Sequence, residues 1–511
     1  MSEGTATSTP LERGLITVSI MLATIMQALD TTIANVALPH MQGTMSATQD
    51  QISWVLTSYI VAAAIMTPPT GFLASRLGRK RLFVIMVTGF TITSMLCGTA
   101  ATLNEIVLFR LLQGAFGAGL VPLSQAVLLD TYPTEKHGSA MAMWGMGVMV
   151  GPILGPTLGG FLTETYNWRW VFFINLPFGI LALLGILAFV PETAKERARN
   201  FDYFGFALLS LAIGALQMML DRGESQDWFA SNEIIIEAVV AGLCLYMFLV
   251  HMFTAKIPFI EPALFRDRNF SVGLLLVFMV GIILLATMAL LPPFLQNLMD
   301  FPVLITGYVL APRGIGTMVA MVFVGRLIGK IDNRLLIFFG ISLTAYSLWE
   351  MSAFTTEVSV TTLVWTGIIQ GVGLGFIFIP LSTLTFSTLA AHFRNEGTAM
   401  FSLMRNIGSS IGISIVFTML SRNTQINHAS LADQMSPFHD AMQAPFLPNA
   451  WNWNITSGLL TLDNEVTRQA ATIAFLNDFT LMMWVMILSA PLLLLLKKPK
   501  KTQSTELAMA E

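Results

Sequence analysis

The sequence predicts an all-α membrane protein that crosses the bilayer about fourteen times. Of its 511 residues, 54% are hydrophobic and only 11% are charged, whereas soluble domains carry about 25% charged residues. A soluble enzyme with this surface would aggregate, but a surface that faces lipid needs such a composition. The apolar runs are continuous and lack period-two alternation, which favours helices over barrel strands. The small net charge of −3 gives no indication of a nucleic-acid partner.

The number of spans follows from the length of the apolar runs, because a helix needs about 20 apolar residues to cross the hydrocarbon core. The first run is too long for the core of a cleavable signal peptide, so we expect it to stay as a transmembrane helix. The fourteen expected spans lie near residues 15–38, 52–74, 82–101, 105–127, 139–162, 170–190, 203–220, 233–253, 271–295, 303–327, 335–354, 361–386, 398–420 and 475–496.

The distribution of basic residues predicts the orientation, since cytoplasmic loops are enriched in Lys and Arg. With the N-terminus inside, 19 of the 27 basic residues fall in cytoplasmic segments, and these include every lysine. An odd number of spans would place the basic C-terminal tail outside. We therefore expect a multi-pass protein of the inner (plasma) membrane with both termini in the cytoplasm.

Two pairs of similar segments indicate an internal repeat. GFLASRLGRKR (71–81) resembles GRLIGKIDNR, which starts 254 residues later at Gly325. QGAFGAGLVPLS (113–124) resembles QGVGLGFIFIPLS, which starts 257 residues later at Gln370. Parallel repeats of this kind are typical of membrane transporters. The repeat predicts a six-span half at 15–190, a linker with two inserted spans at 191–270 and a second six-span half at 271–496. The remaining expected segments are cytoplasmic ends at 1–14 and 497–511 and a long outer loop at 421–474.

Asp30 and Arg110 are the strongest candidates for a functional charge pair. Asp30 lies in the outer half of the first span between apolar neighbours. Because a charge in lipid is costly, its side chain is expected to face the bundle interior, where it can take up a proton from one side and release it to the other. Arg110 lies at a similar depth in the fourth span and stays charged in a dry environment, so it would favour release of that proton. The alternatives are a carboxyl group that only packs helices and a purely structural ion pair.

The run GVMVGPILGPTLGG (147–160) predicts a close helix contact. Its four glycines recur at a strict spacing of four in the fifth span, which gives a smooth ridge that another helix can approach. Its two prolines each remove a backbone hydrogen bond and can kink the helix. The residues of the run that carry this prediction are Gly147, Gly151, Pro152, Gly155, Pro156 and Gly159.

Two further groups of residues complete the candidate site. The loop 71–81 carries basic residues on the cytoplasmic side, and its candidates are Gly71, Arg76, Gly78, Arg79 and Lys80. Arg313 and Arg405 lie within spans, so each is expected to face a water-filled cavity and to contact either a substrate or a structural partner. Gln27 and Gln113 lie on the helical faces of Asp30 and Arg110. We expect the substrate cavity to be lined by Gln27, Gln113, Arg313 and Arg405.

Six segments, in order along the chain, resemble the major facilitator superfamily. More closely, they resemble its fourteen-span drug/proton antiporters of the EmrB/QacA type. The resemblance covers essentially the whole chain, and the last segment is similar to the EmrB branch. The segments are LDTTIANVALP (29–39), GFLASRLGRKR (71–81), RLLQGAFGAG (110–119), GVMVGPILGPTLGG (147–160), WRWVFFINLP (168–177) and LDRGESQDWF (220–229).

The resemblance implies the major facilitator fold, with two six-helix halves and, here, an inserted two-helix hairpin. It implies that Arg110 serves proton coupling and that the loop 71–81 is a gate. It also implies that the glycine run is the antiporter motif of proton-driven exporters, which seals or bends the interface between the halves. The family usually has an acidic residue where Ser75 stands, and this departure weakens the expected charge relay. A periplasmic adaptor protein and an outer-membrane channel are the implied partners.

The leading hypothesis is a proton-coupled multidrug exporter of hydrophobic or amphiphilic compounds. A cavity rich in Met and Phe would repack around many ligand shapes. The segment GRLIGKI lacks the spacing of a phosphate-binding loop, so we expect no cofactor and no metal, and a proton gradient as the driving force. One alternative is an exporter or permease of the same fold for a specific metabolite or siderophore. Another is a receptor or channel that does not transport, although that reading gives no reason for duplicated halves.

Overall fold

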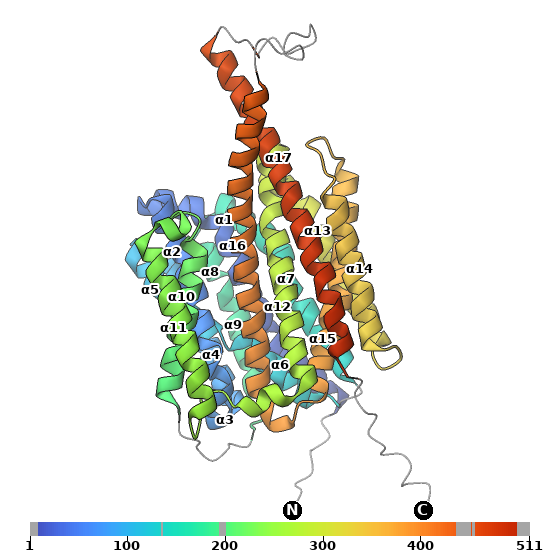
Figure 1. The fold of residues 1–511 in the computed structure, drawn as a ribbon. Helices are drawn as coiled ribbons and strands as arrows, with labels where there is room; N and C mark the ends of the chain where they lie inside the picture. The colour runs from blue at the N-terminus through green and yellow to red at the C-terminus, as the bar shows by residue number, and fades with distance from the viewer. Residues whose placement is uncertain (1–8, 134–135, 194–200, 436–450, 452–454, 498–511) are drawn as a thin grey trace, which may run out of the picture.

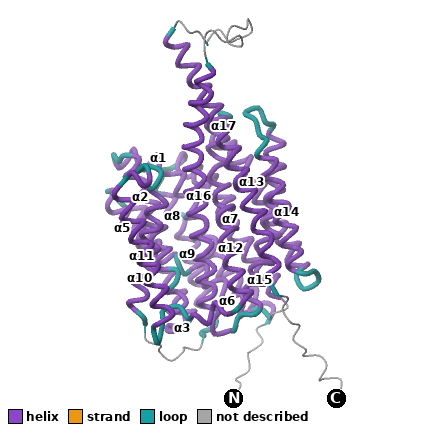
Figure 2. Tube along the Cα trace, viewed as in Figure 1, coloured by secondary structure: helices purple, strands orange, loops and turns teal. Residues whose placement is uncertain are grey.

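The computed structural model describes residues 9–133, 136–193, 201–435, 451 and 455–497. Within these ranges the chain forms a bundle of long helices that run side by side (Figure 1), joined by loops and turns (Figure 2). The α-helices are α1 (Pro10–Met45), α2 (Gln49–Met66), α3 (Pro69–Leu77), α4 (Arg79–Thr99), α5 (Leu103–Gly117), α6 (Leu120–Thr131), α7 (His137–Thr165), α8 (Trp170–Phe173), α9 (Asn175–Phe189), α10 (Tyr203–Arg222), α11 (Asn232–Thr254), α12 (Arg268–Pro293), α13 (Val303–Leu327), α14 (Asn333–Met351), α15 (Val360–Ser387), α16 (Arg394–Gln434) and α17 (Thr456–Ser489).

Local sequence explains where several helices begin and bend. Each of α1, α2 and α5 begins with a capping box, in which a threonine hydroxyl accepts a hydrogen bond from the third helical residue and that residue's side chain accepts one in return. The capping residues are Thr9, Thr48 and Thr102. Helices α2 and α3 form one bent pair, with an angle of 57° at the break that contains Pro68.

Every expected span coincides with a helix or with a broken pair of helices. Twelve helices in the described part of the chain are long and apolar enough to cross a membrane, and the bent pair α2/α3 brings the number to thirteen. Helix α14 lies over the remaining expected span. The all-α fold is therefore confirmed, and fourteen spans remain a prediction with which the structure is compatible.

The same helix pairs pack in both halves of the chain. Helix α1 packs on α7 as α12 packs on α16, α2 on α5 as α13 on α15, and α4 on α5 as α14 on α15. The two inserted helices α10 and α11 pack on each other, and α10 also contacts α2 and α16. Across the bundle, the most extensive contact between the halves joins α7 to α13.

The prediction of an outer loop at 421–474 is wrong for most of its length, because most of this interval is helical. Helix α16 continues to Gln434 and α17 begins at Thr456, and the two rise together beyond the other helices (Figure 1). A hydrogen bond of 3.0 Å between His428 and Asp463 joins them there. Hydropathy missed this extension because a helix outside the membrane needs no apolar run. Within the interval, residues 436–450 and 452–454 lie outside the described residues.

Large apolar side chains cover the outside of the bundle. Leu184, Leu243 and Trp484, for example, are each more than half exposed. An exposed apolar surface of this extent is a lipid-facing surface. The polar and charged side chains that could carry function lie inside the bundle.

Candidate functional site: a buried charge cluster

A carboxylate and a guanidinium meet inside the first half of the chain. Arg110 Nη1 on α5 donates a hydrogen bond of 2.7 Å to Asp30 Oδ2 on α1. Both side chains are almost completely enclosed, with 0% exposure for Asp30 and 1% for Arg110. A charge at this depth is stable only when it is paired and hydrogen-bonded, and both conditions hold here. The sequence predicted that the two residues approach each other.

Asp30 accepts hydrogen bonds on both of its carboxylate oxygens. Besides the bond from Arg110, its Oδ1 atom accepts bonds of 2.8 Å from Gln113 Nε2 and from Asn175 Nδ2. Asn175 is the first residue of α9, and its Nδ2 atom also lies 2.9 Å from Ser94 Oγ on α4. Three donors from two helices, α5 and α9, therefore converge on one carboxylate.

Arg110 is held by more than its acidic partner. Its Nε atom donates a bond of 3.1 Å to the carbonyl oxygen of Val55, and its Nη1 atom a bond of 2.9 Å to Gln113 Oε1. The guanidinium also lies over the ring of Tyr59, 4.2 Å from its centroid, a cation–π contact that a buried site strengthens. If the Asp30 carboxylate moved away, Arg110 would thus keep its contacts with Val55, Gln113 and Tyr59.

Gln113 lies within the charge cluster in this conformation. It was expected to line the substrate cavity, but its side chain is fully buried and both amide atoms are bonded within the charge cluster. Gln27 is half-buried, and its Nε2 atom donates a bond of 3.3 Å to the hydroxyl of Tyr59. The amide groups therefore organise the pair and its surroundings rather than an open cavity.

Sequence reasoning missed Asn175 and Ser94. Asn175 stands within WRWVFFINLP, a segment used only as evidence of resemblance. An asparagine at the start of an otherwise apolar run is itself a signal, because an amide inside a bundle needs a partner. The partner could not be identified from the sequence because α1 and α9 are 145 residues apart at this contact.

The glycine ridge of α7 packs against α1. A Cβ atom at Gly151 would overlap the carbonyl group of Ala28, and one at Gly155 would overlap the hydroxyl of Thr32. The two outer members behave alike, since Gly147 meets Met21 and Gly159 meets Ile33. Pro152 and Pro156 lie within the same helix. The ridge is therefore a close contact inside the first half, on both sides of Asp30.

A different face of α7 forms the interface between the halves. A Cβ atom at Gly145 would lie 2.8 Å from Met321 Sδ on α13, and one at Gly138 would lie 2.8 Å from Ile328 Cβ just after it. Nearer the outside, Gly314 on α13 packs against Ile153. Helix α7 thus connects the aspartate-bearing helix α1 to the second half.

The basic loop joins the halves on the side expected to be cytoplasmic. Arg79 pairs with Asp130, which also pairs with Arg394 of the other half at 2.5 Å. Arg79 Nε donates a bond of 2.6 Å to Asn395 Oδ1, and Ser75 Oγ accepts a bond of 3.4 Å from the amide of the same asparagine. Ser75 thus supplies a neutral contact where the family usually has an acid.

The other candidates in the loop differ in their surroundings. Gly71 lets α3 lie directly on α16, because a Cβ atom there would be 2.9 Å from Glu396 Cα. Gly78 has φ +88°, a left-handed conformation that favours glycine. Arg76 is exposed and Lys80 is half-buried, and neither makes an ion pair with another described residue. Arg79 is thus the loop cation that carries the contact between halves.

The second half contains buried charges without the matching partners. Arg313 is 6% exposed, and its Nη2 atom donates a long bond of 3.4 Å to the carbonyl oxygen of Leu284. Arg405 is half-buried and, like Arg313, has no acidic partner among the described residues. Asp478 is 1% exposed, and neither carboxylate oxygen has a hydrogen-bond partner among the described residues. The described part of the chain contains no group of His, Cys, Asp and Glu side chains that could hold a metal ion.

The helix pairing, the repeat and the internal ion pair define a polytopic membrane transporter. The family profile of the Major Facilitator Superfamily matches residues 20–413. The chain therefore belongs to this superfamily, in its EmrB branch. It is 38% identical to the multidrug export protein EmrB of Escherichia coli (strain K12), over 84% of this chain and 85% of that protein.

Other relatives give the same placement over a longer stretch. The fatty acid resistance protein FarB of Neisseria gonorrhoeae is 36% identical over 95% of this chain and 96% of that protein. Among solved structures, the human organic anion transporter MFSD10 (TETRAN) superposes with a TM-score of 0.59, covering 94% of this chain and 100% of that one. Its sequence identity is 14%, so this likeness concerns the fold alone.

Proposed function

We propose that this chain is a proton-coupled exporter of diverse hydrophobic and amphiphilic compounds, located in the inner membrane with both termini in the cytoplasm. The observation that carries the proposal is the enclosed Asp30–Arg110 pair, in which a titratable group lies inside the bundle at a helix contact. The names of the relatives, which refer to multidrug export, support the direction and the class of substrate.

Protonation of Asp30 is the step that we expect to drive the change of conformation. The charged carboxylate holds Arg110 Nη1 at 2.7 Å and two amide donors at 2.8 Å. A neutral carboxyl group attracts these donors less, so the attachment of α1 to α5 and α9 weakens. Arg110 keeps its bonds to Val55 and Gln113, so the proton moves α1 relative to the rest of the cluster.

The glycine ridge supplies the mechanical connection to the other half. Ala28 and Thr32, one on each side of Asp30 along α1, lie against Gly151 and Gly155 of α7. Because the two helices are in contact along this ridge, a shift of α1 displaces α7. Helix α7 packs on α13, so the displacement reaches the interface between the halves.

The cytoplasmic contacts supply the gate. Arg79, Asp130 and Arg394 form a chain of charges between the halves, and Asn395 bonds to Arg79 beside it. These contacts must separate before a compound can enter from the cytoplasm or the inner leaflet. Protonation of Asp30 therefore favours one arrangement of the two halves over the other. The cytoplasmic contacts are weak enough to break, so the second arrangement also stays accessible.

Partners of this exporter are part of the same proposal. The extension of α16 and α17 beyond the bundle offers a surface for a periplasmic adaptor, which would lead to an outer-membrane channel (Figure 1). Crosslinking in cells followed by purification tests this point, with capture of an adaptor expected and loss of capture after deletion of residues 424–434 and 456–466. A strictly solitary chain would contradict it.

The decisive experiment replaces Asp30 by a side chain of the same shape that cannot titrate. Asp30→Asn in everted vesicles should reduce gradient-driven drug uptake at least tenfold, because the proton carrier is removed. Asp433→Asn, an exposed aspartate on the α16 extension, is the matched control and should export normally. Undiminished uptake by Asp30→Asn, with the protein folded in the membrane, would exclude proton coupling through this residue.

A further inference from the structure

The two halves share a contact that places their residues in correspondence. In the first half Gly114 of α5 lies against the carbonyl group of Tyr59 on α2. In the second half Gly371 of α15 lies against the carbonyl group of Arg313 on α13. The numbering agrees with this correspondence: Gly371 follows Gly114 by 257 residues and Arg313 follows Tyr59 by 254, the same offsets as those of the two repeated segments. Arg313 therefore occupies the position of Tyr59.

A second shared contact extends the correspondence to the acid. Gln113 Nε2 donates to Asp30 Oδ1 at 2.8 Å, and Gln370 Nε2 lies 3.5 Å from Thr287 Oγ1. Gln370 follows Gln113 by 257 residues, and Thr287 follows Asp30 by the same number. Thr287 thus stands where the first half has its aspartate, so the second half has a hydroxyl group at this position in place of a carboxylate.

The buried arginine lies on different helices in the two halves, on α5 in the first and on α13 in the second. The offset of 257 relates Arg110 to Gly367, which has no side chain. A Cβ atom at Gly367 would lie 3.6 Å from Arg313 Cβ, so Arg313 fills the side of α15 that the glycine leaves open. Its guanidinium reaches the first helix of its half at Leu284 O, as Arg110 reaches α1 at Asp30.

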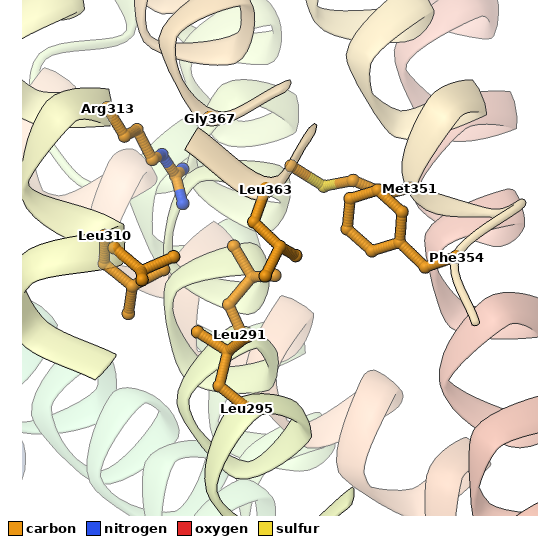
Figure 3. Close-up of a pocket in the computed structure, with 9 residues that line it drawn as sticks. Leu291, Leu295, Leu310, Arg313, Met351, Phe354, Leu363 and Gly367 are labelled. Atoms are coloured by element: carbon orange, nitrogen blue, oxygen red, sulfur yellow. The ribbon is translucent and has the colours of Figure 1, made fainter. Parts of the chain in front are cut away.

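The guanidinium of Arg313 points into an apolar pocket (Figure 3). No carboxylate among the described residues lies within ion-pair distance, and the buried carboxylate of the same half, Asp478, has no hydrogen-bond partner there. A buried guanidinium in such surroundings attracts an anion strongly, because little water competes for it. The apolar side chains that line the pocket with Arg313 are Leu291, Leu295, Val309, Leu310, Met351, Phe354 and Leu363.

We propose that Arg313 binds the carboxylate of amphiphilic acids that the protein exports, with their apolar part against the leucines and Met351 of the pocket. The inference rests on the proposed function and names one of its substrate classes and the residue that selects it. The pocket is narrow in this conformation, and flexible side chains such as Met351 allow it to widen around a ligand. A charged headgroup on an apolar body is the chemistry that matches one cation among aliphatic side chains.

Binding of radiolabelled dodecanoate to the purified chain in maltoside micelles at pH 8 tests the proposal, with dodecanol as the neutral competitor of equal length. The wild type should bind dodecanoate at least tenfold more tightly than dodecanol, and Arg313→Gln should reduce this ratio to about one. Arg313→Lys retains the charge and should keep part of the preference. Arg326→Gln, which removes an exposed arginine near the end of the same helix, is the matched control and should keep the ratio. Arg405→Gln separately tests the other arginine that was expected to line the cavity.

Thr287→Asp provides an independent test that leaves Arg313 in place. It rebuilds the acid of the first half, so an internal carboxylate should compete with the ligand and lower the ratio. An equal ratio in the wild type and Arg313→Gln would overturn the proposal, as would loss of the ratio in Arg405→Gln alone. Because the measurement uses no gradient, Asp30→Asn should retain the ratio, and failure of this inference is separate from failure of proton-coupled export.

Discussion

The two halves of the transporter place an arginine in the same region of one scaffold and surround it differently. In the first half Arg110 is neutralised by Asp30, and amide groups saturate the carboxylate. In the second half Arg313 occupies a corresponding place, Thr287 replaces the acid, and apolar side chains fill the surroundings. In the proposed mechanism the difference divides the work of a duplicated fold: one half carries the proton and the other leaves a charge for a ligand.

The largest expected contrast concerns removal of each arginine. Arg110→Gln leaves Asp30 as a buried charge without its cation, which should cost about 3–5 kcal/mol of stability. Arg313→Gln removes a buried charge for which the described part of the chain supplies no acidic partner, so it should be neutral or stabilising. Thermal unfolding of both variants in one detergent at pH 8 measures the contrast. Equal losses would show that the two arginines are held alike.

The amide groups give a second matched pair. Gln113→Leu removes a hydrogen bond to a charged carboxylate, which is expected to cost about 1.5–3 kcal/mol. Gln370→Leu removes a long bond to a hydroxyl group and should cost about 1 kcal/mol or less. The same thermal unfolding assay compares the two. A larger loss for Gln370→Leu would contradict the assignment of the charge cluster to the first half.

The ridge between α1 and α7 is sensitive to a single methyl group. Gly151→Ala forces a Cβ atom into the carbonyl group of Ala28, so the helices must separate, at a cost of about 1–3 kcal/mol. Export should fall together with stability, because Ala28 lies two residues from Asp30. Gly160→Ala is the control, since no atom lies within 4 Å of a Cβ atom there. Drug uptake by everted vesicles that is unchanged in Gly151→Ala would argue against the ridge as the connection to α13.

The smallest effect is expected at the gate. Arg79→Gln removes one partner of Asp130, which keeps Arg394, and the carboxylate is partly exposed. The loss of stability should therefore be about 1 kcal/mol or less. Arg76→Gln, at an exposed cation of the same loop, should have no measurable effect. Thermal unfolding at low and high salt checks both, and a salt-independent loss in Arg79→Gln would point to packing rather than charge.

The sequence predicted the helices and the charge pair well because both follow from the properties of a lipid solvent. A helix must be apolar for its whole length in lipid, and a charge there must face the interior. The same rule explains the failure at residues 421–474, where helices outside the membrane carry no such signal. Two features depend on how the helices are rotated, which hydropathy does not record. One is the contact between Asp30 and Asn175. The other is that the buried arginine lies on α5 in the first half but on α13, and not on α15, in the second.

The sequence predicted that the glycine ridge of α7 makes a close contact, but not which helix it contacts. The spacing of Gly147, Gly151, Gly155 and Gly159 defines one helical face, which is a local property. Which helix covers that face is decided by the packing of the whole bundle, and the structure places α1 there. Because the ridge lies against α1 on both sides of Asp30, we propose that it transmits movement of α1 to α7.

Proton release from the purified protein on addition of a drug tests most directly whether the first half carries the proton. Measured with a pH dye in weakly buffered detergent, release should occur in the wild type and in Asp433→Asn and should be absent in Asp30→Asn. Asp478 is the competing carboxylate, because it is buried in the second half without a hydrogen-bond partner among the described residues. Release that persists in Asp30→Asn and disappears in Asp478→Asn would contradict the account and move the proton to the second half.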